Sequence, residues 1–191
     1  MKVEILNEII KGRRSVFPPD YVDKEIPDDV ILQLLENANW APTHKLTEPW
    51  RFKVVKSEAK KRLGNFLAEK YKSTVPNEQF LQKKYDKLVC NSVKSGAVIL
   101  ICFQRDPEEK IPEWEELASV AAAVQNLWLS CHAYGIGAYW STPVVINFIS
   151  EFVELAPNER CMGIFYMGYY SSQPKNASRT RIGDKTKWIL E

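Results

Sequence analysis

Apolar residues recur at intervals of three and four along the first segment of the chain, which predicts an amphipathic helix. They stand at Val3, Leu6, Ile9 and Ile10, and a glycine, Gly12, follows them. Glycine readily adopts the left-handed conformation that commonly ends helices. We therefore expect the helix to end at Gly12.

Three further segments show helical spacing. One begins at Pro27, where proline suits a first helical position, and stops before Pro42. Another begins at Ser57, an N-cap residue, and runs to about Tyr71. The longest, residues 113–134, is apolar on nearly every face, which is typical of a helix buried in the core or at a subunit contact.

The strand pattern is different. Residues 51–55 alternate polar and apolar, residues 97–103 form a continuous apolar run typical of a central strand, and shorter strands are expected after the turn at 135–140 and over 161–168. Helices and strands mix without regular βαβ units, which favours an α+β fold. We expect one domain over residues 1–191.

Two segments lie outside these patterns. Residues 73–95 are rich in lysine and are expected to be helical and exposed, as a lid. Residues 171–176 are interpreted as a linker that opens an extended C-terminal tail, 171–191. The tail carries Trp188 and Ile189, so we expect it to dock on a partner chain.

Composition excludes several classes of protein. The net charge is +2 and the 26 basic residues are dispersed, so no cationic stripe points to nucleic acid. No segment has the length of a membrane span or the form of a signal peptide, and we expect a cytoplasmic protein without membrane contact. The four cysteines lack C-x-x-C spacing and are expected to be reduced thiols: Cys90, Cys102, Cys131 and Cys161.

Two basic clusters stand near opposite ends of the chain. Arg13, Arg14 and Ser15 offer forked guanidinium donors and a hydroxyl, a combination suited to a phosphate. The alternative is a helix C-terminus at which cations favour the macrodipole. Arg179 and Arg181 form the second cluster, and its alternative is a solvated, charged end of the chain.

The loop after the second predicted helix has prolines at both ends, Pro42 and Pro49, which stiffen it. Its interior carries small, hydrogen-bonding and cationic residues, Thr43, His44 and Lys45, ahead of a tryptophan. Such a loop suits contact with a flat ring.

A third candidate is Trp140, which closes a short strand and precedes Ser141 and Thr142. The tryptophan either lines a pocket or belongs to the core. His132 is interpreted as a core residue, and with His44 as the other histidine no metal-site spacing is present.

The acidic cluster Glu113, Glu115 and Glu116 opens a predicted helix and is interpreted as a surface feature that complements the helix dipole. Trp114 and Trp128 are expected to be core residues. The sequence has no Walker A motif, no nucleophile elbow and no dinucleotide fingerprint.

Taken together, these features resemble the nitroreductase family of FMN-dependent oxidoreductases, particularly its shorter members. The resemblance covers nearly the whole chain. It rests on Arg13-Arg14-Ser15, the Ala-Pro-Thr-His-x-x-x-x-Pro-Trp loop at 41–50, the long helix at 113–134, the turn at 135–142 and the basic tail ending at Trp188.

The resemblance implies a central, mostly antiparallel sheet flanked by helices and an interlocked homodimer with FMN in two interface clefts. It assigns the phosphate and ribityl end to Arg13, Arg14 and Ser15, with Arg179 or Arg181 completing the clamp. It places Pro42, Thr43 and His44 along the flavin from one subunit, and Trp140, Ser141 and Thr142 beside it from another.

The implied reaction passes hydride from NAD(P)H through flavin N5 to a small electron-poor acceptor, such as a nitroaromatic or a quinone, with ping-pong kinetics. The flavin carries the redox chemistry, so no catalytic residue is required. Alternatives are a flavin-binding or interaction protein without turnover, and another flavin reaction such as dehalogenation or flavin breakdown.

Two departures from the family pattern concern the reduced flavin. Many members carry a lysine where this chain has Val16 and Phe17, and the segment before Pro49 reads Leu-Thr-Glu instead of Asn-x-Gln. Lys45 and Arg14 are the candidates for stabilising the reduced ring.

Overall fold

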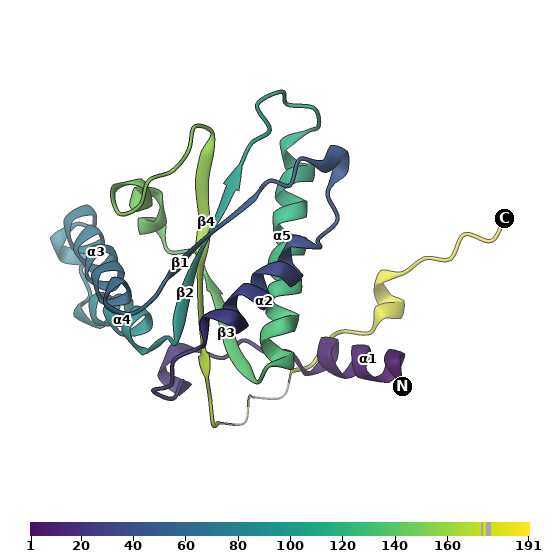
Figure 1. Ribbon diagram of the computed structural model, residues 1–191, viewed down its shortest axis with the longest axis horizontal. Coiled ribbons are helices and arrows are strands. Elements are labelled where there is room, and N and C mark those ends of the chain that lie inside the picture. Colours follow the sequence, from purple (N-terminus) through teal and green to yellow (C-terminus); the bar gives the residue numbers. More distant parts are fainter. Residues whose placement is uncertain (173, 175–176) are drawn as a thin grey trace.

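The computed structural model describes residues 1–172, 174 and 177–191; Gln173, Lys175 and Asn176 of the predicted linker lie outside the described residues. Its centre is a four-stranded antiparallel sheet with the order β1-β2-β4-β3. The expected α+β class with an antiparallel sheet is confirmed (Figure 1). The strands are β1 Trp50–Val55, β2 Ala97–Gln104, β3 Ile136–Ser141 and β4 Glu159–Tyr169.

The continuous apolar run forms the central strand β2, as predicted. Ile99 and Ile101 pack into the core on one face of the sheet, while Val98 and Leu100 pack into the core on the other. All four are fully buried. A strand buried on both faces needs no polar positions, which explains why its sequence does not alternate.

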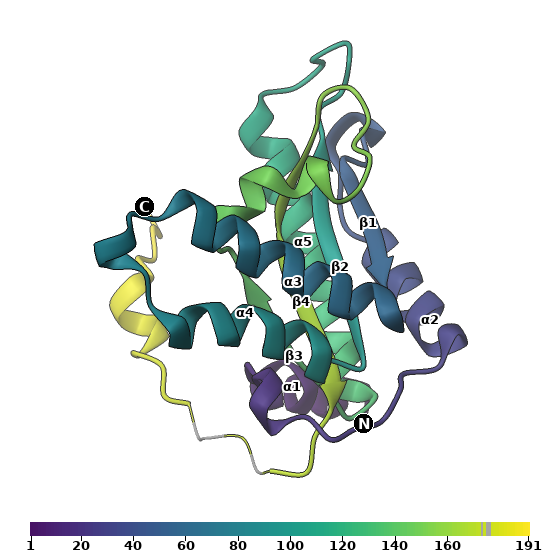
Figure 2. The same ribbon diagram turned by 90° about the vertical axis from the view of Figure 1, so that its left-hand side faces the viewer.

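Two helical layers enclose the sheet (Figures 1 and 2). Helices α2 (Asp28–Asn39) and α5 (Glu113–Ala133) cover one face. Helices α3 (Glu58–Thr74) and α4 (Gln82–Lys94) cover the other. Helix α1 (Lys2–Gly12) lies at the C-terminal end of α5, away from the sheet.

The predicted role of Gly12 is wrong. Gly12 is the last residue of α1 and does not have a positive φ, and Arg13 leaves the helix with φ −55° and ψ 130°. A Cβ on Gly12 would lie 2.5 Å from His132 Nε2. The glycine therefore permits close approach of α1 to the end of α5.

The segment 73–95 is helical, as expected, but it is not a wholly exposed cover. A short 3₁₀ turn over Asn77–Gln79 precedes α4, which packs against α3. Leu88, Asn91 and Ser92 of α4 are buried. The lid remains a prediction.

The tail and α1 present apolar side chains to solvent. After a 3₁₀ turn at Ile182–Lys185, Trp188 and Ile189 are 81% and 82% exposed. Helix α1 has no buried residue. The tail extends away from the body of the molecule (Figure 1), so its docking on a partner remains a prediction.

The four cysteines are free thiols, two buried (Cys102 and Cys131) and two partly buried (Cys90 and Cys161). Within the described residues, no helix combines the length and the apolar character that crossing a bilayer requires.

Candidate functional site

The two ends of the chain meet at one cavity, although 165 positions separate Arg14 from Arg179 in the numbering. A cavity of about 430 Å³ is lined by Arg13, Arg14 and Arg179, together with Ile10, Lys11 and Ala177. We call the three arginines and this cavity the arginine region. Arg181 does not line it and is exposed at the start of the 3₁₀ turn.

The guanidinium groups of the arginine region lack carboxylate partners among the described residues. Arg13 lies over the Trp128 ring, 4.5 Å from its centroid, and its buried Nη1 has no hydrogen-bond partner among the residues that the structure describes. Arg14 Nη1 donates only to the carbonyls of Lys11 (2.6 Å) and Arg13 (2.8 Å).

Burial lowers the pKa of Arg13 from its ordinary value, and the nearby charges of Arg179 and Arg14 lower it further. Desolvation and like-charge repulsion both oppose the charged form. An anion in the cavity would relieve the repulsion and give the free donors acceptors. The arginine region therefore has the chemistry of an anion site.

Strand β3 joins Ser15 to the predicted residues at 140–142. Ser15 forms a parallel bridge with Ala138, and Val16 N donates to the Ala138 carbonyl (3.1 Å). Ser15 also lines a second cavity of about 450 Å³ together with Arg14. The segment after Arg14 therefore runs beside the strand that leads to Trp140.

Trp140 combines features of both interpretations. Its ring is partly buried against the core, and its Nε1 is buried without a hydrogen-bond partner. The ring packs over Gly163, whose φ is 157° and whose added Cβ would lie 2.1 Å from Trp140 Nε1. Glycine is required there to admit the indole.

The next two residues diverge. Ser141 Oγ accepts a hydrogen bond from Tyr139 Oη (3.3 Å). Thr142 is exposed and lines a separate cavity of about 430 Å³ against α3 and α4, which includes Tyr71 and Lys84. The structure thus does not bring Thr142 to the arginine region.

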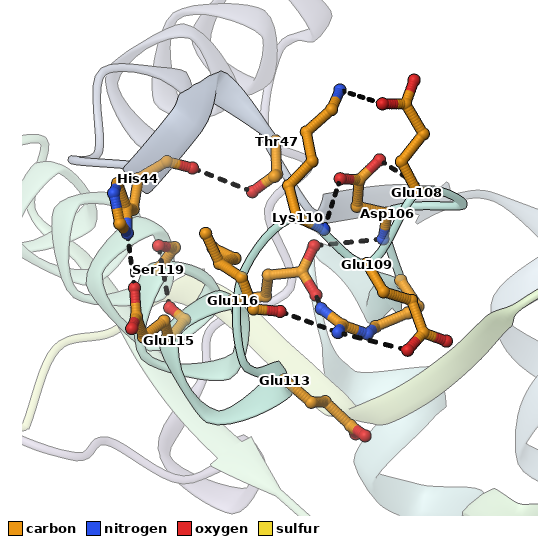
Figure 3. Close-up of polar contacts among 12 residues, drawn as sticks. His44, Thr47, Asp106, Glu108, Glu109, Lys110, Glu113, Glu115, Glu116 and Ser119 are labelled. Atoms are coloured by element: carbon orange, nitrogen blue, oxygen red, sulfur yellow. Dashed lines mark hydrogen bonds and ion pairs between the residues drawn. The ribbon is translucent and has the colours of Figure 1, made fainter.

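The proline-bounded loop forms another cavity, of about 480 Å³. Pro42, Thr43 and His44 line it from the loop; Trp114, Glu115, Ala118, Ser119 and Ala122 line it from the first turns of α5. We call these residues the loop region; Figure 3 shows three of them, His44, Glu115 and Ser119. Lys45 does not line this cavity, and its side chain is exposed.

The loop backbone is strained. Lys45, Leu46 and Glu48 have φ of 56°, 54° and 42°, the left-handed region that non-glycine residues rarely adopt. Each such residue costs about 1–3 kcal/mol and persists only where the surroundings enforce it. Strain of this kind clusters at functional sites.

Hydrogen bonds within the loop enforce its conformation. Glu48 N donates to Thr43 Oγ1 (3.1 Å), and Thr47 N donates to the His44 carbonyl (3.4 Å). His44 Nδ1 lies 2.6 Å from Glu115 Oε2, which ties the loop to α5 (Figure 3).

The acidic cluster that opens α5 is not simply a surface feature, so that interpretation is wrong for Glu116. Glu116 is fully buried, forms an ion pair with Arg105 and accepts a hydrogen bond from Asp106 N (3.0 Å). Glu113 pairs with Arg160 on the surface. Each of the three carboxylates therefore has a partner.

Sequence reasoning missed the roles of Glu115 and Trp128. Glu115 was grouped with its acidic neighbours, yet it shares a helix face with Ala118 and Ala122, and this i, i+3, i+7 spacing beside small residues was the available signal. The prediction of two core tryptophans is confirmed for Trp128, which packs edge-on against Phe165 and also supports Arg13. It is wrong for Trp114, which is 68% exposed on the first turn of α5.

The two regions lie toward opposite ends of α5 (Figure 1). Glu115 of the loop region and Trp128, under Arg13, are separated by about 20 Å along the helix axis at 1.5 Å per residue. A ligand held by both regions of one chain would have to stretch along more than three helical turns.

Comparison with known proteins identifies the family of the chain. The model of the nitroreductase family matches residues 10–169. YfhC of Bacillus subtilis, named provisionally as an NAD(P)H nitroreductase, is 32% identical over 184 residues, which cover 95% of this chain and 92% of YfhC.

Solved structures share the fold. A nitroreductase-like family protein from Bacillus cereus superposes with a TM-score of 0.82 at 29% identity, covering 96% of this chain and 95% of that one. The FMN-dependent nitroreductase NfnB from Mycobacterium smegmatis, solved in complex with NADPH, gives 0.79 at 15% identity with full coverage of both chains. With the family model matched over most of its length, the chain belongs to the nitroreductase family of oxidoreductases.

Proposed function

We propose that this protein is a homodimeric, FMN-dependent reductase that oxidises NAD(P)H and reduces small electron-poor acceptors such as nitroaromatics or quinones, by ping-pong kinetics. The observation that carries the proposal is the arginine region. It gathers three guanidinium groups around one cavity, where no atom of the described residues accepts a hydrogen bond from the buried Arg13 Nη1.

The residues of the arginine region fit the phosphate of FMN. A phosphate monoester carries nearly two negative charges at neutral pH and several acceptor oxygens. Arg13 and Arg14 from one end of the chain and Arg179 from the other supply free donors and uncompensated charge. Ser15 follows these arginines at the neighbouring cavity, where it suits the polar ribityl chain.

A dimer unites the two regions. Because about 20 Å of α5 separates them in one chain, we place the loop region of one protomer against the arginine region and Trp140 of its partner. Two-fold symmetry then forms two equivalent sites. The apolar residues exposed on α1 and on the tail, Leu6 and Trp188 among them, supply surface for this contact.

When bound, FMN supplies the hydride chemistry. The residues of this chain bind and orient it: the arginines fix the phosphate end, and Pro42 and Thr43 present a stiff loop to the ring. Trp140 Nε1, which is buried against Gly163 and has no partner among the described residues, is the donor that we assign to the flavin from this side of the site. Lys45 is the proposed cation for stabilising the reduced ring, because Arg14, the other candidate, is placed at the phosphate end.

The test is an anaerobic titration of the purified, FMN-loaded protein with NADH and NADPH, followed by flavin absorbance. Rapid bleaching by either nucleotide, and reoxidation by a quinone, is expected. A protein that binds FMN but bleaches with neither is the inert flavin binder. A protein that takes up no FMN contradicts the proposal outright, and a particle of 22.0 kDa in light scattering contradicts the dimer.

A further inference from the structure

We propose that His44 is the proton donor to the electron acceptor, and that Glu115 is the positioning residue that holds its ring for this step. The inference rests on the proposed function, since it concerns the acceptor that reoxidises the reduced enzyme. It assigns roles to two residues that neither the cofactor phosphate nor the arginine region requires.

The geometry of the pair supports proton transfer. His44 Nδ1 and Glu115 Oε2 are 2.6 Å apart, a short charge-assisted hydrogen bond. The His44 side chain is 56% exposed and that of Glu115 is 25% exposed. Both line the same cavity, so the pair stands at the surface that a small molecule would reach.

The contact determines which ring nitrogen is free. Glu115 accepts from Nδ1–H, and within the described part of the chain Nε2 has no hydrogen-bond partner. A carboxylate on one imidazole nitrogen fixes the orientation of the ring and holds a proton on that nitrogen. In the doubly protonated ring, the proton on Nε2 is therefore the one that His44 can donate to an acceptor.

The loop holds His44 in a defined place. His44 stands immediately before the left-handed residues Lys45 and Leu46, in a 3₁₀ turn closed by the Thr47 N–H on its carbonyl. The Glu115 contact fastens this turn to α5. A strained loop fastened by one side-chain contact is consistent with the contact having a function of its own.

The cavity around the pair, about 480 Å³, is the one to which the proposed function assigns the flavin ring, and a flat, uncharged acceptor would stack on that ring within it. Pro42, Trp114, Ala118 and Ala122 give it apolar walls, and the small alanines leave the space open. The polar groups on its lining are few, which suits orientation of a small molecule by one or two hydrogen bonds.

The chemistry balances for a quinone. Its two-electron reduction to a hydroquinone takes up one hydride and one proton. The reduced cofactor of the proposed function gives the hydride and is oxidised. The Nε2–H bond of His44 breaks, an O–H bond forms on the quinone oxygen, and the neutral ring keeps its proton on Nδ1 against Glu115. Solvent then restores the imidazolium.

The first test measures reoxidation in a stopped-flow instrument. Wild-type and His44→Gln holoenzymes are photoreduced without NAD(P)H, so that the result does not depend on nucleotide oxidation, and are mixed with 1,4-benzoquinone or with ferricyanide, which accepts electrons without protons. We expect quinone reoxidation to slow by about 100-fold, within the range of general acid catalysis, and ferricyanide reoxidation to change by less than about twofold.

Two results would overturn the assignment: an unchanged quinone rate in His44→Gln, or an equal loss with both acceptors, which indicates a damaged site. Failure of the proposed function is recognised separately, because it shows as a wild-type enzyme that neither bleaches with NAD(P)H nor binds FMN.

The second test measures which nitrogen of the His44 ring carries the proton, and it needs no turnover. The chain has only two histidines, so nitrogen-15 chemical shifts of His44 can be assigned with a His132→Gln variant. We expect neutral His44 to carry its proton on Nδ1 in the wild type, and to revert to the Nε2–H form common in solution in Glu115→Ala. The matched control is Glu113→Ala, in the same helical turn but paired with Arg160.

Reoxidation rates of Glu115 variants show whether Glu115 positions His44 or only stabilises the fold. Glu115→Ala should slow quinone reoxidation by about tenfold and leave the ferricyanide rate unchanged, and Glu115→Asp should recover part of the loss. The same tautomer in the wild type and in Glu115→Ala would refute the role of Glu115.

Discussion

Three carboxylates open α5 beside the loop region, and three guanidinium groups gather in the arginine region, but their charges are compensated differently. At the N-terminal end of α5, Glu113, Glu115 and Glu116 have partners within the chain in Arg160, His44 and Arg105. Near the other end, the partners of Arg13 and Arg14 within the described part of the chain are backbone carbonyls and an aromatic ring. Charge satisfied inside the chain serves the fold, whereas uncompensated charge around a cavity indicates a missing ligand.

The difference predicts opposite consequences of mutation. Removing the buried carboxylate of Glu116 should cost stability, because Arg105, whose side chain is only 16% exposed, loses its counter-charge. Removing a cation from the arginine region should weaken ligand binding. It should change the free energy of unfolding little, because it also removes repulsion between the guanidinium groups.

The largest effect is expected for Glu116→Gln. It leaves Arg105 without its buried counter-charge and should lower the free energy of unfolding by about 3 kcal/mol. Urea denaturation measures the loss. The matched control, Glu113→Gln, breaks a half-exposed pair and should cost less than about 1 kcal/mol. Equal losses in the two variants would contradict the structural role of Glu116.

Next in size is Arg13→Ala, which should weaken FMN binding by about 1.5–3 kcal/mol, the worth of a hydrogen bond to a charged group. Unfolding of the FMN-free protein should change by less than about 1 kcal/mol, because the lost contact with Trp128 is offset by relief from Arg179. A fluorescence titration measures affinity, and Arg62→Ala, an exposed cation on α3, is the control. Unchanged FMN affinity would remove Arg13 from the site.

A third variant, Gly163→Ala, concerns the support of Trp140. The added methyl would overlap the indole and should destabilise the protein by about 2 kcal/mol, as overpacking does. Thermal unfolding of the FMN-free protein, followed by near-ultraviolet circular dichroism, detects both the loss and the displaced indole. Gly183→Ala, where a Cβ meets nothing within 4 Å, should be nearly neutral; a neutral Gly163→Ala would show that the indole is free to move.

The smallest effect is a pH dependence at Glu159. Burial raises the pKa of this carboxyl, but Lys53, 2.8 Å away, and the Ala156 N–H outweigh burial and hold it below its ordinary value. A lowered folded-state pKa gives stability at neutral pH that is lost as the pH falls through the acidic range. The stability difference between wild type and Lys53→Met should therefore shrink from pH 6 to pH 3; a constant difference would contradict this coupling.

The sequence predicts the framework of the molecule better than its details, for physical reasons. The run at 97–103 and the all-round apolar helix at 113–134 require burial whatever their neighbours are, and both were identified. The role of Gly12 was missed because it depends on His132, far away in the chain. Glu116 was misassigned because its burial depends on Arg105 reaching back from a loop.

The candidate site shows the same limit: residue types were predicted, but contacts between distant residues were not. The types of the residues alone predicted Arg13, Arg14 and Arg179, and the fold brings these three together. They did not show that Arg179, and not Arg181, lines the cavity. They also did not show that Thr142 lines a different cavity. Contact with Glu115 was not predictable, because no local pattern relates residue 44 to residue 115.

The central claim is that each FMN site combines the arginine region of one protomer with the loop region of the other. A heterodimer tests it most directly: one chain carries Arg13→Ala and Arg14→Ala, the other carries Ala118→Trp, which fills the loop cavity, and two affinity tags isolate the mixed species. Sites shared between protomers leave one site intact, so one FMN per heterodimer is predicted from flavin absorbance, while both parent homodimers bind none. A heterodimer without FMN would place the site within a single chain and contradict the account.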